Sequence, residues 1–203
     1  MQEALLIQFA KEPVPGQVKT RMLPALSPEQ AVHLHCDLVH WTAQVLTGAG
    51  VGAVELAVAG STRSPLFEQC RTLGVEAIRP QRGSGLGHRM CNALEEGLSR
   101  YAKVILVGSD CPQIDSAYLE QAAALLDAND VVLGPAEDGG YVLIGVTDLD
   151  WRWFDGVHWG TDTVYADTVT RLEATETSWS ALPVLQDIDR PEDLRLWRTI
   201  AGG

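Results

Sequence analysis

Short apolar runs alternate along the first half of the chain with longer stretches in which apolar residues recur every three or four positions. The apolar runs, which predict β-strands, lie at residues 4–9, 54–59, 75–78 and 103–107. The amphipathic stretches, which predict helices, lie at residues 28–46, 65–73, 86–101 and 116–128. Strands and helices that alternate in this way form βαβ units, so the pattern predicts an α/β, Rossmann-like fold with a mostly parallel sheet flanked by helices.

The second half of the chain departs from this alternation. Residues 130–133 and 142–146 form two apolar runs joined by a turn rich in acids and glycine, residues 137–141, and such a turn can lie over a pocket. No repeat, linker or low-complexity tract interrupts the sequence, and its 203 residues suit one domain of ordinary size. We therefore predict a single domain over residues 1–203.

The last third of the chain carries a tryptophan-rich segment, residues 151–160, followed by a predicted helix and strand. Thr161 is predicted to cap this helix, with Asp162 in its first turn. An apolar strand is predicted from Val184, and Pro191 suits the first position of a closing helix. The tryptophans suit either an oligomer or partner surface or the roof of a binding pocket.

The composition narrows the class of protein. A formal net charge of −12 disfavours binding to nucleic acids and makes any local cluster of cations conspicuous. The four cysteines lie far apart without a C-x-x-C pair, which favours reduced thiols over zinc or disulfides. No apolar run approaches the ~20 residues of a membrane span, and the N-terminus lacks the features of a signal peptide. We therefore predict a cytoplasmic protein without a membrane span.

Two carboxylates are predicted at the ends of separate strands. Gly108 and Asp110 follow one strand, which places the acid at the sheet edge where α/β proteins bind ligands. The last strand leads into an acidic segment that contains Asp189. Because Mg²⁺ and Mn²⁺ take oxygen ligands and share their shell with phosphates, we predict Asp110 and Asp189 as a metal pair. The alternative is that Asp110 caps the following helix and that Asp187 or Asp189 caps the last one.

A basic loop follows the first strand. It contains Lys11, Lys19 and Arg21 and is stiffened by prolines and a glycine. A loop between a strand and a helix can cradle phosphate through its backbone N–H groups and its cations. It is not a Walker A loop, because Val18 stands where that motif has a glycine before its lysine. The alternative is a solvated surface loop.

Several blocks of sequence resemble, in the same order, a small bacterial family of GT-A-fold proteins like nucleotide-diphospho-sugar transferases. These blocks lie at residues 9–11, 13, 15–16, 18–21, 108–112, 134–141 and 159–161. The family is related to the guanylyltransferases of molybdenum-cofactor and deazaflavin-cofactor synthesis, and residues 187–194 resemble the latter. The resemblance implies a GT-A fold and a bound nucleotide.

The resemblance also implies roles for individual residues. Lys11, Lys19 and Arg21 would contact the phosphates, Asp110 would take the place of the metal-binding acid, and Asp189 would complete the metal site. The nucleotide-binding residues implied in all are Lys11, Gly16, Lys19, Arg21, Gly87, Arg89, Ser109 and Asp110. One departure is that the family tends to carry Asp and Glu where this chain has Gly85 and His88, in a loop expected beside the nucleoside.

Residues after the fifth predicted strand are candidates for chemistry on an acceptor. Glu137 or Asp138 would accept a proton from an acceptor hydroxyl if the reaction inverts configuration. Gly139, Gly140, Tyr141 and Trp159 are the predicted acceptor-binding residues, although an acid before two glycines is also an ordinary turn residue and a strand tyrosine is often core. The histidines have no partner in the sequence and stay outside the catalytic set.

Three functions fit these observations. The favoured one is a transferase that uses Mg²⁺ or Mn²⁺ to move a sugar from a nucleotide diphosphate sugar to a small-molecule acceptor. The second is nucleotidyl transfer from an NTP to a phosphorylated small molecule; the prolines in the basic loop, where related nucleotidyltransferases carry glycines, favour sugar transfer. The third is a nucleotide-binding module without catalysis. An oligomer is compatible with each.

Overall fold

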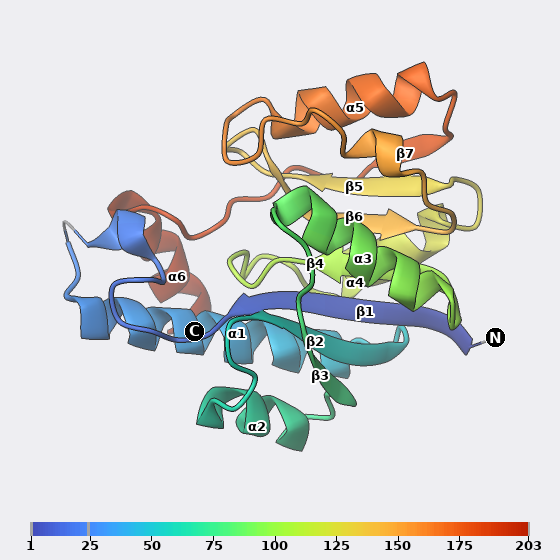
Figure 1. The fold of residues 1–203 in the computed structure, drawn as a ribbon. Coiled ribbons are helices and arrows are strands. Elements are labelled where there is room, and N and C mark those ends of the chain that lie inside the picture. Colours follow the sequence, from blue (N-terminus) through green and yellow to red (C-terminus); the bar gives the residue numbers. More distant parts are fainter. Residues whose placement is uncertain (1, 24, 203) are drawn as a thin grey trace.

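A single seven-stranded sheet forms the centre of the protein (Figure 1). The computed structural model describes residues 2–23 and 25–202, so the ends of the predicted domain, Met1 and Gly203, and Pro24 lie outside the described residues. The strands are β1 (Gln2–Lys11), β2 (Ala53–Ala59), β3 (Ala77–Pro80), β4 (Tyr101–Val107), β5 (Val131–Pro135), β6 (Tyr141–Val146) and β7 (Trp179–Ala181). Their order is β3-β2-β1-β4-β6-β5-β7, and β6 alone runs antiparallel to its neighbours. The predicted α/β fold with a mostly parallel sheet is confirmed.

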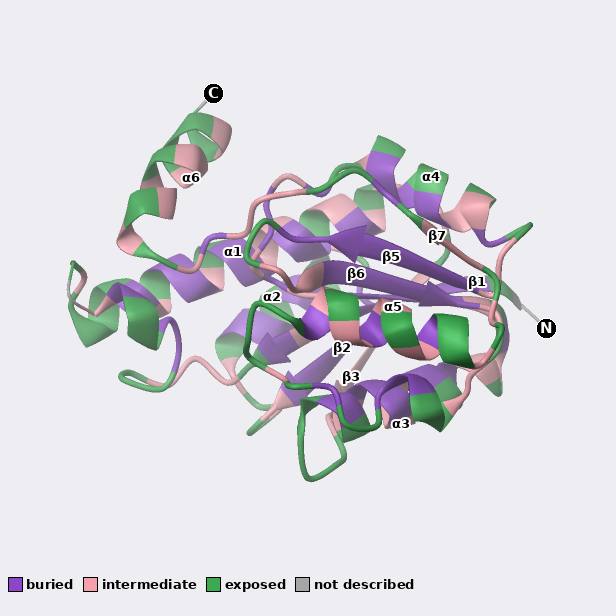
Figure 2. Cartoon of the chain, turned by 90° about the horizontal axis from the view of Figure 1, so that it is seen from above, coloured by how far each residue is buried: buried purple, intermediate pink, exposed green. Residues whose placement is uncertain are grey.

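Helices cover both faces of this sheet (Figure 2). The α-helices are α1 (Pro28–Gly48), α2 (Pro65–Thr72), α3 (Leu86–Leu98), α4 (Ser116–Leu125), α5 (Val164–Ala174) and α6 (Leu194–Ala201). Short 3-10 helices are η1 (Thr20–Met22), η2 (Trp151–Trp153) and η3 (Pro191–Asp193). Helices α1, α2 and α4 pack on one face and α3 and α5 on the other, which gives three layers.

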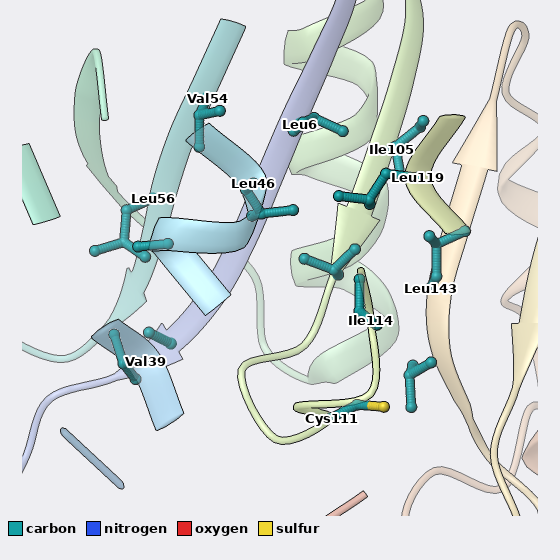
Figure 3. Close-up of a cluster of buried hydrophobic side chains, with 14 of the residues drawn as sticks. Leu6, Val39, Leu46, Val54, Leu56, Ile105, Cys111, Ile114, Leu119 and Leu143 are labelled. Carbon is teal, nitrogen blue, oxygen red and sulfur yellow. The ribbon is translucent and has the colours of Figure 1, made fainter. Parts of the chain in front are cut away.

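Alternation along the strands explains the two cores. Leu6 of β1 and Ile105 of β4 contact the α1, α2 and α4 side, shown in Figure 3, whereas Leu5 and Val104 face α3. Because neighbouring strand residues point to opposite faces, a strand that is apolar throughout is buried on both sides. Because β1 runs parallel to both β2 and β4, the carboxyl ends of these three strands meet at one edge of the sheet. The predicted site residues were expected at this edge.

Three predicted element boundaries are wrong. The helix predicted to reach residue 101 ends at Leu98, since Tyr101 already begins β4. The N-cap of α5 is Thr163 and not Thr161, because Thr161 donates its hydroxyl to the carbonyl of His158 in a preceding turn. The acid in the first turn of α5 is Asp167 and not Asp162. The helix predicted over residues 116–128 ends at Leu125.

The strand predicted from Val184 is also wrong in form. The segment runs beside β5, with Leu182 N donating to Leu133 O and Leu185 N donating to Pro135 O. Pro183 lies between them, and because proline lacks an N–H group the ladder is interrupted there. The ladder strand in this region is β7, and residue 185 contributes only an isolated bridge to Ala136.

The end of the described chain packs beside the basic loop, far from it in sequence. Met22, Leu34, Leu38 and Ile188 form a small buried cluster that Leu194, Leu196 and Trp197 of the closing segment cover. Figure 1 shows α6 next to η1 and the first turns of α1, at one end of the sheet. This third cluster brings the two charged segments predicted for the site together. Among the helices of residues 2–23 and 25–202, none has the length and apolar character that a membrane span requires.

Candidate functional site

The basic loop holds Lys19 in an unusual position. Val18 and Met22 are buried on either side of it and anchor the loop, and Lys19 itself is 8% exposed. Its backbone has φ 49° and ψ 39°, the left-handed region that a residue with a side chain rarely occupies. Such conformations cost of order 1–3 kcal/mol and persist where the surroundings impose them, often at functional sites.

The side chain of Lys19 joins the ends of two distant segments. Its Nζ lies 2.7 Å from a carboxylate oxygen of Asp110 and donates to the carbonyl of Ile188 at 2.5 Å. The N–H of Ile188 donates in turn to the carbonyl of Asp110 at 2.7 Å. Although desolvation raises the pKa of Asp110, the Lys19 ammonium outweighs it and lowers this pKa below its usual value. We call this arrangement of Lys19, Asp110 and Ile188 the Lys19 clamp.

Arg21 and Asp189 form a second ion pair beside the clamp. The hydrogen bond that Arg21 donates to Asp189 is the main cause that raises the pKa of Arg21. Neither acid predicted for the metal caps a helix: Asp115 accepts the N–H of Tyr118 and caps α4, and Asp193 accepts the N–H groups of residues 189 and 190. The helix-cap alternative for Asp110, Asp187 and Asp189 is therefore wrong.

Four carboxylates lie close enough to influence one another around the clamp. Burial, together with the charges of Asp138, Asp110 and Asp189, raises the pKa of Asp187 to about 6. As the side chains stand, residues 2–23 and 25–202 contain no group of three or more His, Cys, Asp or Glu side chains arranged to hold a metal ion. Asp110 and Asp189 are instead turned to Lys19 and Arg21.

The remaining residues predicted for the nucleotide differ in their accessibility. Lys11 and Gly16 are exposed on the basic loop, and Gly16 has φ 76°, a turn conformation that suits glycine. Ser109 is buried: its Oγ donates to the carbonyl of Phe9 at 2.7 Å and accepts from Gln8 at 2.9 Å. Ser109 thus ties β4 to β1 with its side chain already engaged.

The predicted nucleoside loop at the start of α3 sends its residues in different directions. Gly87 lies against Trp159, where a Cβ would come within 2.8 Å of the indole nitrogen, so only glycine allows this contact. Arg89 donates instead to the carbonyl of Gly83 at 3.3 Å. His88 has a partner that the sequence could not name, the hydroxyl of Ser84 at 2.7 Å.

The turn between β5 and β6 lies beside the same edge. Asp138 accepts the N–H of Gly140 at 2.9 Å, while Glu137 is exposed. Gly139 has φ 88° and packs directly on the carbonyl of Asp162, which fixes this turn against the segment before α5. Tyr141 packs edge-on against Trp159 with ring centroids 6.4 Å apart, and its hydroxyl is buried.

The sequence prediction assigned no site role to Asp187, whereas it named Tyr141 and Trp159 as acceptor-binding residues and gave the roof of a pocket as one alternative for residues 151–160. The signal for Asp187 was present in the spacing Asp187-Ile188-Asp189, because residues two apart in an extended segment share a face. Cys111 lies beside Asp110 but does not suit a nucleophile, since burial raises its pKa to about 12 and keeps the thiol protonated.

The sheet order and the charged edge define an α/β protein with the fold of nucleotide-diphospho-sugar transferases. The chain belongs to the bacterial family DUF2064, described as "Uncharacterized protein conserved in bacteria", whose sequence profile matches residues 42–161. The resemblance found in the sequence is thereby confirmed at the level of fold and family. No protein of curated function matches the sequence.

Solved structures of similar fold come from several bacteria. A protein of Desulfovibrio desulfuricans G20, described as a "putative nucleotide-diphospho-sugar transferase", is 30% identical with a TM-score of 0.85, over 98% of this chain and 88% of that one. The inositol-1-phosphate CTP transferase of T. maritima is 17% identical with a TM-score of 0.68, over 99% and 97% of the two chains. Rv0371c of Mycobacterium tuberculosis H37Rv, in complex with manganese, is 16% identical with a TM-score of 0.57, over 100% and 99%.

Proposed function

We propose that this protein is a glycosyltransferase that moves a sugar from a nucleotide diphosphate sugar to a small acceptor with the help of Mg²⁺ or Mn²⁺. The observation that carries the proposal is the Lys19 clamp, which gathers a buried cation and several carboxylates at the carboxyl edge of β1 and β4. The 30% identity to the Desulfovibrio desulfuricans G20 protein over most of both chains supports the same class of donor.

The chemistry of the donor set fits a hard divalent cation. Asp110, Asp187 and Asp189 offer carboxylate oxygens, the ligands that Mg²⁺ and Mn²⁺ prefer, and the raised pKa of Asp187 to about 6 marks negative charge that the protein's own cations leave uncompensated. A metal at these acids would stabilise the charge that develops on a diphosphate leaving group. Asp110 and Asp189 would then exchange their present partners, Lys19 and Arg21, for the metal.

Each charged group has a part in the transfer. The bond from the sugar's anomeric carbon to the diphosphate breaks, and its electron pair leaves on the nucleoside diphosphate. Lys19, Arg21 and Lys11 are positioned on one loop to neutralise this charge. The acceptor oxygen forms the new bond to the carbon, and its proton passes to Asp138 or Glu137. Gly139 holds that turn against the segment before α5, and Gly140 donates its N–H to Asp138.

Nucleotidyl transfer is the second candidate. In that reaction a phosphorylated acceptor attacks the α-phosphate of an NTP and pyrophosphate leaves. Three cations on one loop suit a triphosphate as well as a diphosphate, and the T. maritima neighbour, which carries the fold, is named as a CTP transferase. The two reactions differ in the leaving group, which makes them separable in solution.

Thermal unfolding against a panel of nucleotide diphosphate sugars, nucleoside diphosphates and NTPs, each with and without Mn²⁺, tests the proposal. A ligand at a hundred times its Kd adds about 2.7 kcal/mol of stability, and we expect one diphosphate sugar to give a metal-dependent shift. The variant Asp110→Asn should lose it. Asp127→Asn is the matched control, because Asp127 also pairs with a lysine, Lys103, at 2.6 Å. Lys103 lies near the start of β4, whereas the clamp lies beyond the end of this strand.

The outcomes separate the candidates. A shift with an NTP alone, followed by release of pyrophosphate in the presence of a phosphorylated acceptor, would replace sugar transfer by nucleotidyl transfer. Binding of a diphosphate sugar without hydrolysis or transfer over long incubation would favour a nucleotide-binding module. If no nucleotide binds, the proposal fails.

A further inference from the structure

A hollow of about 480 Å³ lies between the start of α3 and residues 151–159. Ser84, Gly85, Gly87 and His88 line it on the α3 side, outside the ion pairs of the Lys19 clamp. Its volume lies within the range of small-molecule sites, which is about 300 to 1,000 Å³. Two residues with predicted roles line it, Trp159 for the acceptor and Gly87 for the nucleotide.

Trp159 connects the hollow to the candidate site. One side of its indole lies on Gly87, and its ring also contacts Tyr141 at the start of β6. Tyr165, a few residues on, donates its N–H to the carbonyl of Gly139 at 2.9 Å. Trp159 therefore lies between the hollow and Tyr141, which follows the turn that carries Asp138, the turn where the proposed transfer needs an acceptor hydroxyl.

Aromatic rings form much of the wall. Phe154 and Trp159 stack with centroids 6.1 Å apart and an interplanar angle of 16°. Trp151 is 41% exposed and lies 6.2 Å from the ring of His88. Tryptophan is enriched at binding interfaces, because its ring offers a large apolar contact area together with an N–H group.

The described side chains that line the hollow offer no arginine or lysine that is free of an acidic partner. Among the described residues that line it, Arg152 is the one lysine or arginine, and Nε of Arg152 donates to both carboxylate oxygens of Asp150, at 2.8 and 3.0 Å. The carboxylate-bearing Asp155 also lines the hollow. A phosphate would meet an occupied cation and a second acid there, in contrast to the basic loop with its three cations.

We propose that this hollow is the acceptor site and that it takes an uncharged, ring-containing molecule with a free hydroxyl group. The ring lies against Trp151 and Trp159, and the hydroxyl points toward Asp138. This inference rests on the proposed glycosyl transfer and specifies its acceptor class. It also disfavours nucleotidyl transfer, because the acceptor in that reaction carries a phosphate.

The hollow can be filled or opened by single substitutions. Gly85 lines it, has an ordinary extended backbone, and a Cβ there meets no atom within 4 Å, so Gly85→Leu adds volume without a clash. Trp151→Ala removes an aromatic wall. Gly48→Leu is the matched control: it also has open space at its Cβ, and it lies at the end of α1, on the opposite face of the sheet.

Fluorine NMR of protein labelled with 5-fluorotryptophan gives a readout that does not depend on activity. The probes are phenyl β-glucoside and adenosine, each compared with its phosphate ester, and Trp151→Phe, Trp159→Phe and Trp197→Phe assign the resonances. We expect the uncharged probes to shift Trp151 and Trp159 but not Trp197, which packs on Trp41 outside the hollow. Trp151→Ala should weaken this binding about tenfold, as the loss of an aromatic contact predicts. Gly85→Leu should weaken it because the leucine side chain occupies the hollow, and Gly48→Leu should leave it unchanged.

The thermal shift by nucleotides, measured on the same variants, keeps the two proposals apart. Loss of probe binding with an unchanged nucleotide shift supports the acceptor site. Tighter binding of the phosphate esters, or equal probe binding by Gly85→Leu and the parent, overturns it. If the probes bind as expected and no nucleotide binds, the hollow remains a ring-binding site and the proposed transfer fails instead.

Discussion

Two acids in this protein, the buried Glu55 and the half-buried Asp187, have opposite surroundings. Glu55, in the middle of β2, is 5% exposed and accepts two hydrogen bonds each from Arg79 and Arg100, at 2.7 to 3.3 Å. Burial raises its pKa, but the two guanidinium groups outweigh burial and lower this pKa overall. Asp187, at the candidate site, has its pKa raised to about 6 by burial and by three neighbouring carboxylates.

This contrast separates structural charge from functional charge. A buried acid that is fully matched by cations needs nothing further from solution, so the Glu55 cluster suits a role in holding β2, β3 and α3 together. An acid that lies among other acids is destabilising in its charged form unless a cation binds beside it. Such groups are concentrated at functional sites. The comparison predicts that substitutions in the two clusters act in opposite directions on stability and on activity.

The largest effect is expected from Lys19→Gln. It removes the cation that joins Asp110 to residue 188 and that would neutralise the leaving diphosphate, so kcat/KM should fall by about 10² to 10³. Lys103→Gln is the control, because Lys103 makes an ion pair of 2.6 Å with the exposed Asp127. Steady-state kinetics with the donor found by thermal shift checks both. Equal activity of the two variants would remove Lys19 from the site.

Glu55→Gln should have the largest effect on stability. It leaves two arginines without their carboxylate, and breaking a buried ion pair costs about 3 kcal/mol, at the low end because both guanidinium groups reach solvent. Urea unfolding measures the loss, which corresponds to about 6 to 12 °C in Tm for a chain of this size. Nucleotide binding below the new Tm should be unchanged. A variant as stable as the parent would show that the cluster contributes no net stability.

The stability that Glu55 contributes through Arg79 and Arg100 depends on pH. The pKa of Glu55 is lower in the folded state than in the unfolded chain, where it is about 4.3. Its contribution to stability is therefore present above this value and is lost as the pH falls through the folded pKa. The gap in unfolding free energy between the parent and Glu55→Gln should be full at neutral pH and close under acid conditions. A gap that stays constant would assign it to packing instead.

Asp187→Asn should have the opposite sign. The substitution removes one of four carboxylates that repel one another, so the free energy of unfolding at pH 7 should rise by about 1 to 2 kcal/mol. The metal-dependent shift by nucleotides should weaken in the same variant. Asp130→Asn would be a poor control because that acid is bonded to Ser178, so the exposed Asp127→Asn serves again. Destabilisation by Asp187→Asn would mean that its charge is already compensated.

The sequence predicted the sheet well because burial on two faces leaves a simple signal. Mostly apolar runs marked β1, β2 and β4, although Gln8 and Glu55 interrupt the first two. Two of the predictions that were wrong depended on a single donor or acceptor. Pro183 interrupts a ladder, and Thr161 bonds to a carbonyl behind it rather than to the helix ahead.

The candidate site was predictable by position but not by partner. That Asp110 and residues 187–189 meet follows from strand ends at one sheet edge. That Lys19 binds both segments depends on a left-handed backbone at a lysine, which no sequence pattern indicates. The sequence could not decide whether the tryptophans form a partner surface or the roof of a pocket. The hollow depends on how residues 151–159 pack on Gly87, which no local pattern indicates.

The smallest expected effect extends the comparison from charges to hydroxyl groups. Tyr118 donates its hydroxyl to the carbonyl of Pro183 at 3.0 Å, so Tyr118→Phe should cost about 1 kcal/mol of unfolding free energy. The buried hydroxyl of Tyr141, beside the hollow, has no hydrogen-bond partner within residues 2–23 and 25–202. Tyr141→Phe keeps the ring against Trp159 and removes an unsatisfied group, so stability should be equal or slightly higher. Urea unfolding of the two variants side by side measures the difference. A loss of about 1 kcal/mol in Tyr141→Phe would show that Thr168, whose hydroxyl donates to the carbonyl of Val164, also accepts from Tyr141, and the two hydroxyl groups would then be equivalent.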